Sequence, residues 1–187
     1  MIGFLAVAVV VIVAPGPDFA LTLKNSMRGG GAATALGVVT GQVVWVGATA
    51  AGVAALLAAS HPAFVALRLV GAVYLVWLGL ATLLARGGHT PRHGAGSPFR
   101  QGLLSNLANP KMAVFFTSLL PQFGTGFAEL LGLGLVFSSL TLLWLSAYAL
   151  AVARTRQVLV RGRVRRALDA LSGLALAALG IRLAAES

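Results

Sequence analysis

Cysteine is missing from this sequence and acidic residues are scarce. The absence of cysteine excludes disulfide bonds, thiol redox relays and cysteine-bound zinc. The chain has only four acidic residues, and its charged fraction is 10%, against about 25% in water-soluble domains. Hydrophobic residues make up 58% of the chain, and the mean hydropathy is +0.92. Because so little polar surface cannot face water on all sides, we expect one membrane domain over residues 1–187.

Six apolar segments divide the chain, and each is long enough for the ~20 residues that cross a bilayer core as a helix. They cover residues 2–28, 33–58, 63–85, 99–123, 127–153 and 167–185. The fold class that this pattern predicts is all-α, an integral membrane protein of six transmembrane helices.

Basic residues follow alternate segments. Eleven of the fourteen lysines and arginines come after the first, third or fifth segment: Lys24, Arg28, Arg86, Arg92, Arg100, Arg154, Arg156, Arg161, Arg163, Arg165 and Arg166. The opposite side has only Arg68 and Arg182. Since basic loops stay on the cytoplasmic side of a membrane, we expect both termini to lie outside. Anionic lipid headgroups account for the net charge of +10 without a nucleic-acid partner.

Proline interrupts the first and fourth segments, at Pro15-Gly16-Pro17 and at Asn109-Pro110-Lys111. Pro17 and Pro110 lie 93 positions apart, about half the length of the 187-residue chain. Each half has three segments, and because three is an odd number the two halves cross the membrane in opposite orientations. Paired broken helices at matching positions are typical of transporters with inverted repeats and a binding site near the bilayer midplane. Two ordinary proline kinks are the alternative. The expected units are repeat one at about 1–85, a cytoplasmic connector at about 86–98 and repeat two at about 99–187.

The prolines also free backbone carbonyls near the expected bilayer centre. Because proline has no N–H, the carbonyls of Val11, Val13 and Asn106 lose their helical partners. Unpaired backbone groups cost several kcal/mol in hydrocarbon and are tolerated only where they line a cavity or are buried in protein. We therefore expect the breaks to line a cavity, where free N–H groups at the half-helix starts suit a carboxylate.

Two charged residues fall deep in the expected membrane, Asp18 after the first break and Lys111 after the second. A charge at the bilayer centre costs about 2.5–3.5 kcal/mol on insertion scales, and the repeat symmetry would relieve part of this cost by bringing the two together. Asp18 suits a proton or a substrate ammonium group, or it caps the half-helix that starts there. Lys111 is an anion contact, a partner of Asp18 or a lysine that snorkels from a short helix.

Uncharged polar residues complete the candidate site. Asn106 and Asn109 offer amides to a substrate or serve the turn before proline. Gln42 faces the cavity or bonds a neighbouring helix. An acid, a cation and two half-helix ends match both poles of a zwitterion. The substrate- or proton-binding candidates are Asp18, Lys111, Pro15, Gly16, Pro17, Asn106, Asn109, Pro110 and Gln42.

The motifs resemble those of the LysE/RhtB family of amino-acid exporters over nearly the whole chain. They are Pro15-Gly16-Pro17-Asp18-Phe19, Asn106-x-x-Asn109-Pro110-Lys111, Phe115-Phe116 and Pro121-Gln122-Phe123. The resemblance implies a six-span protein of the bacterial inner membrane that exports amino acids or related metabolites in exchange for protons. Met112 departs from the family pattern, in which a smaller residue is usual.

Other functions have less support in the sequence. Intramembrane aspartyl proteolysis needs two deep acids, and a zinc protease helix needs H-E-x-x-H, so we expect no enzyme. A phosphate-binding loop is missing, and we expect neither a cofactor nor a bound metal. An exporter of a metal ion or another small solute and a non-transporting assembly protein stay as alternatives, and a homodimer stays open.

Overall fold

The computed structural model describes residues 1–84 and 96–154, and seven separate positions between 170 and 185. These residues form helices and no strand. The elements are α1 (Ile2–Val13), α2 (Pro17–Ser26), α3 (Gly31–Ala59), α4 (His61–Leu84), α5 (Pro98–Leu107), α6 (Pro110–Val114), the π-helical turn η1 (Phe115–Leu119), the 3-10 turn η2 (Leu120–Gln122) and α7 (Phe127–Arg154). Most of the expected connector, 86–98, and the expected sixth span, 167–185, lie outside the continuous described ranges.

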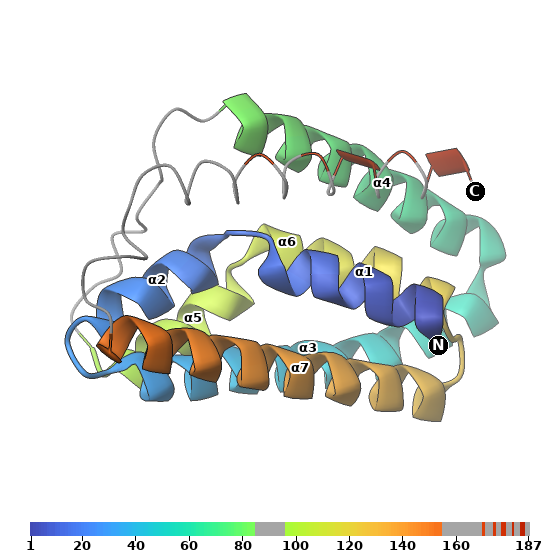
Figure 1. Cartoon of the computed structure of the whole chain (residues 1–187). Helices are drawn as coiled ribbons and strands as arrows, with labels where there is room; N and C mark the ends of the chain where they lie inside the picture. Colours follow the sequence, from blue (N-terminus) through green and yellow to red (C-terminus); the bar gives the residue numbers. More distant parts are fainter. Residues whose placement is uncertain are drawn as a thin grey trace.

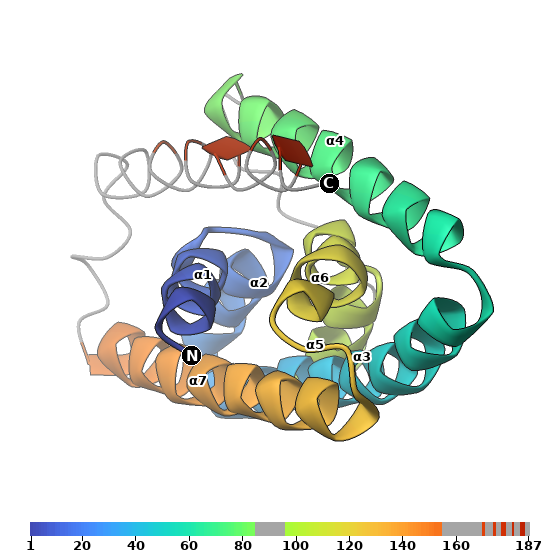
Figure 2. The same cartoon turned by 90° about the vertical axis from the view of Figure 1, so that its right-hand side faces the viewer.

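The helices pack in three layers (Figure 1). The long helices α3 and α7 lie side by side on one face, the short helices α1, α2, α5 and α6 form the middle, and α4 covers the other face (Figure 2). Large apolar side chains point outward, such as Val44, Val73 and Leu143, which are 53%, 70% and 68% exposed. Such a surface suits contact with lipid better than contact with water.

Two described helices are long and apolar enough to cross a membrane, α3 over Gly31–Gly52 and α7 over Phe127–Arg154. α1 and α2 pass the same test only as a pair, and they meet at a bend of 55°. The described residues thus provide two or three membrane spans, and the number six stays a prediction.

Proline sets the starts of the short helices. α1 ends at Val13 and α2 begins at Pro17, and α6 begins at Pro110 in the same way. Proline suits the first helical position because the N–H there has no helical partner. The segment after Pro110 is helical, but it does not stay α-helical to its end. The α-helical form ends at Val114 and continues as η1, a π-helical turn of the kind found often at functional sites.

Glycine allows α3 and α5 to touch through their backbones. A Cβ on Gly37 would collide with the carbonyl oxygen of Phe99, and a Cβ on Gly102 would collide with the carbonyl oxygen of Thr34. Small residues at such crossings are typical of helix contacts in membranes. The crossing fixes α5 against the N-terminal third of α3, which positions the polar end of α5 for the site described next.

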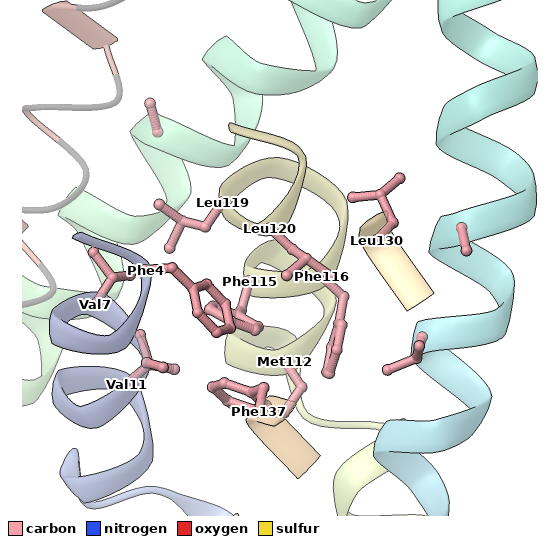
Figure 3. Packing of buried hydrophobic residues seen from close by; sticks show 14 residues of the cluster. Phe4, Val7, Val11, Met112, Phe115, Phe116, Leu119, Leu120, Leu130 and Phe137 are labelled. Carbon is pink, nitrogen blue, oxygen red and sulfur yellow. The ribbon is translucent and has the colours of Figure 1, made fainter. Parts of the chain in front are cut away.

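An apolar cluster fills the space between α1, the segment from α6 to η2, and α7 (Figure 3). The rings of Phe115 and Phe137 stack with their centroids 4.1 Å apart, and Phe116 meets Phe137 edge-on. The labelled members are Phe4, Val7, Val11, Met112, Phe115, Phe116, Leu119, Leu120, Leu130 and Phe137. The cluster extends toward the end of the molecule at which α1 and α7 begin (Figure 1).

Candidate functional site

Asp18 lies in the first turn of α2, and its carboxylate faces residues of the other half of the chain. Oδ1 accepts a hydrogen bond from the hydroxyl of Ser105 at 2.7 Å. Oδ2 accepts from the side-chain amides of Asn106 at 2.8 Å and Asn109 at 3.0 Å. A carboxylate offers about four acceptor positions, so three donors leave about one for a proton or an ammonium group. The site therefore holds a buried carboxylate that has about one acceptor position left among the described residues.

Lys111 stands at the start of α6 and reaches the end of α1. Its backbone N–H is capped by Oδ1 of Asn109 at 3.0 Å. Its Nζ donates to the carbonyl oxygens of Val11 at 3.1 Å and Ala14 at 2.9 Å. The Val11 carbonyl is one of those that proline leaves without a helical partner. The lysine of one half thus completes the broken helix of the other.

The contacts of Asp18 and Lys111 are reciprocal between the two halves. Each charged residue follows a proline break, and each bonds to polar groups beside the other break. Their hydrogen bonds are made with uncharged groups, and they form no direct ion pair within the described part of the chain. The two charged residues therefore line the same cavity but do not contact each other.

Gln42 links the cavity to the long helices. Its Nε2 donates to the hydroxyl of Thr141 on α7 at 3.2 Å and lies 3.8 Å from the sulfur of Met112. Its Oε1 is buried and has no hydrogen-bond partner among the residues that the structure describes. The sequence left two alternatives for Gln42, a cavity-facing side chain or a bond to a neighbouring helix. The structure has both, because Gln42 lines the cavity and bonds α7. A buried, unpaired carbonyl oxygen beside the cavity is available to a substrate donor.

The cavity between these residues is small, about 20 Å³, which gives room for about one water molecule. Its polar lining comes from Asp18, Gln42, Lys111 and Thr141, and Phe137 belongs to its apolar lining. An amino acid does not fit in such a space. A substrate of that size therefore requires the groups that line the cavity to move.

Most of the residues that the sequence singles out meet at this place. Pro15 lies between α1 and α2, and Gly16 is the N-cap of α2. The alternative that Asp18 caps α2 is therefore wrong, because its carboxylate accepts from the other half instead. The carbonyl of Asn106, expected to be free, accepts from the backbone N–H of Asn109 at 3.0 Å.

Two polar residues of the site were not expected from the sequence. Ser105 donates the shortest of the three hydrogen bonds to Asp18, and Thr141 holds Gln42. Both are single hydroxyl residues in otherwise apolar surroundings, which is common in membrane helices and gives a weak signal. The one signal for Ser105 was its place directly before Asn106, which was already a candidate for the site.

Comparison with known proteins identifies the family. The model of the LysE type translocator family matches residues 9–187. The chain belongs to this family. This chain is 29% identical to the threonine efflux protein of Salmonella typhimurium (strain LT2) over 98% of each chain. It is 35% identical to the leucine efflux protein of Salmonella choleraesuis over 64% of this chain and 61% of the relative.

A third relative, the uncharacterized membrane protein YrhP of Bacillus subtilis (strain 168), is 24% identical over 97% of each chain. No solved structure matches the chain. The resemblance found in the motifs is confirmed, and with its apolar helices the chain is a multi-pass membrane protein of a transporter family.

Proposed function

We propose that this protein exports amino acids from the cytoplasm by exchange with protons. The observation that carries the proposal is the buried carboxylate of Asp18, held by donors of the opposite half at a cavity that Lys111 also lines. Relatives named for the efflux of threonine and of leucine support a zwitterionic substrate over a metal ion. A metal ion would also call for several carboxylate, imidazole or thiolate ligands.

Asp18 serves as the proton carrier in this scheme, and it lines the same cavity as the substrate. The carboxylate takes up a proton from outside and carries it inward. Arrival of the substrate ammonium group then favours the charged carboxylate, so the proton leaves to the cytoplasm. Because a substrate ammonium group in the cavity is attracted by the charged carboxylate and not by the protonated one, substrate and proton favour opposite states of Asp18, which is the requirement for antiport.

The proposed architecture is six spans in two inverted repeats, at about 1–85 and 99–187. The reciprocal contacts of Asp18 and Lys111 support it, because a two-fold relation between the halves would place each charge beside the other half's break. Both termini face outward in this arrangement, in the inner membrane. The apolar cluster around Phe115 and Phe137 then lies on the external side of the cavity, whose lining includes Phe137.

Export from cells fed with dipeptides tests the proposal. Peptide hydrolysis raises the internal pool of each amino acid, and expression of the protein should lower that pool and raise the external concentration for one or a few amino acids. Unchanged export across the whole amino-acid panel would reject the substrate class. Export of a metal ion or another solute in a parallel panel, or of nothing, would then favour the alternatives named above.

A further inference from the structure

The C-terminal end of α1 carries backbone carbonyls that α1 itself cannot pair. The carbonyl of Val11 would accept from the residue four positions on, which is Pro15 and has no N–H. Ala14 is the C-cap, so its carbonyl lies where the helix stops. The carbonyl end of a helix also carries the negative end of the helix dipole. In a membrane such a place attracts a cation that has N–H groups to donate.

A primary ammonium group already occupies this place in the structure. Nζ of Lys111 donates to the Val11 carbonyl at 3.1 Å and to the Ala14 carbonyl at 2.9 Å. Gly16 leaves the room that the group needs, since a Cβ there would lie 3.3 Å from Nζ. The lysine side chain is only 7% exposed, so the contact is inside the protein. The carbonyl end of α1 is therefore a formed site for a group with one positive charge and three N–H donors.

We propose that the carbonyl end of α1 binds the primary ammonium group of the transported substrate, and that Lys111 holds this place between transport events. This inference rests on the proposed function, because it assigns one part of an amino acid to one wall of the same cavity. The ammonium groups of lysine and of an amino acid have the same charge and the same donors. The carbonyls of Val11 and Ala14 already accept from Nζ of Lys111, so a substrate ammonium group must displace Lys111 to bind there.

The displacement leaves every charged group with a partner. Lys111 stays attached to the start of α6, and its released ammonium group can pair with the substrate carboxylate. A zwitterion adds no net charge to a cavity that already contains Asp18 and Lys111. The carbonyls of Val11 and Ala14 have an N–H partner before and after the exchange, so they are never left unpaired in the membrane.

Lys111→Met tests the site without relying on transport. Methionine keeps most of the length of the side chain but removes the ammonium group, which leaves two buried carbonyls without a donor. We expect the purified variant to unfold roughly 4–8 °C below the wild type. Ammonium chloride should restore most of this loss, and tetramethylammonium chloride at the same concentration should not, because it has no N–H. Lys24→Met, which replaces the only other lysine, should respond equally to both salts.

Lys111→Ala provides a second variant, with ethylammonium chloride in place of the lost side chain. The amine is present throughout solubilisation, so a variant that folds only with the amine supports the proposal. Equal effects of ammonium and tetramethylammonium on the Lys111 variants would overturn the proposal. It would also be overturned if neither ammonium nor ethylammonium changed the yield or the unfolding midpoint of these variants. Neither readout depends on amino-acid transport, so a failure of the ammonium site and a failure of the proposed function give different results.

Discussion

Replacement of Asp18 by asparagine separates the charge of the site from its hydrogen bonds. The remaining oxygen can accept from Asn106 and Asn109, and the new NH₂ group can donate to the Ser105 hydroxyl, which rotates to accept. Hydrogen bonds to a charged group contribute about 1.5–3 kcal/mol and neutral ones about 0.5–1.5, so three bonds lose about 3 kcal/mol. The smaller cost of burying a neutral group offsets part of this loss. We therefore expect Asp18→Asn to insert and fold.

Transport by the same variant should fail, because no group remains to exchange a proton for the substrate. One inward proton exchanged for one outgoing zwitterion moves one net charge, which is worth about 2.3 kcal/mol at 100 mV. At 1.4 kcal/mol per decade this energy sustains a gradient of about fifty-fold. Uptake of the exported amino acid, identified in a labelled panel, into energised inside-out vesicles should approach that ratio for the wild type and stay near one for Asp18→Asn.

Two further variants control this result. Glu129→Gln removes an acid at the exposed start of α7, where the carboxylate accepts only from the backbone N–H groups of Thr125 and Gly126, and it should accumulate substrate like the wild type. Asp18→Ala leaves three buried donors unpaired at about 1–3 kcal/mol each, so it should yield much less folded protein. Accumulation above about tenfold by a well-folded Asp18→Asn variant, a gradient worth about 1.4 kcal/mol, would refute the reasoning.

Three other changes have expected outcomes. Gly37→Ala should lower the unfolding midpoint in detergent because its methyl group collides with the α5 backbone, whereas Gly47→Ala, with nothing within 4 Å, should not. Met112→Ala should widen the cavity, so that in competition assays the transport preference shifts by about tenfold toward amino acids with larger side chains. Met27→Ala, at an exposed position, should leave this preference unchanged. Lys111→Met should keep the exchange of internal for external substrate but lose net efflux, because nothing then replaces the substrate at α1; equal loss of both modes would contradict this role.

The helix starts at Pro17 and Pro110 follow from local chemistry, because a residue without N–H ends one helix and suits the start of the next. The contact between Gly37 and α5 was also within reach of the sequence, since small residues mark close helix crossings in membranes. The π-helical turn at Phe115 was not. Its form depends on how the aromatic rings pack against α7, which the order of residues does not reveal.

The partners of Asp18 show why the rest of the site could not be predicted. Whether the carboxylate meets Lys111 or the amides of Asn106 and Asn109 depends on the rotation and depth of α2 against α5. The composition of the chain does not determine this geometry. The sequence left a pairing of the two charges as one alternative among three, and the structure gives each of them neutral partners from the opposite half. Ser105 was missed for the same reason, since a single serine in an apolar segment has many places to point.

Gradient-driven accumulation in proteoliposomes tests the central claim most directly. The purified protein is reconstituted with a panel of labelled amino acids, with and without an imposed proton gradient, beside Asp18→Asn. The account predicts that one or a few amino acids accumulate, that dissipation of the gradient abolishes the accumulation, and that the variant shows none. Failure of every amino acid to accumulate, or accumulation that persists without a proton gradient, would contradict it.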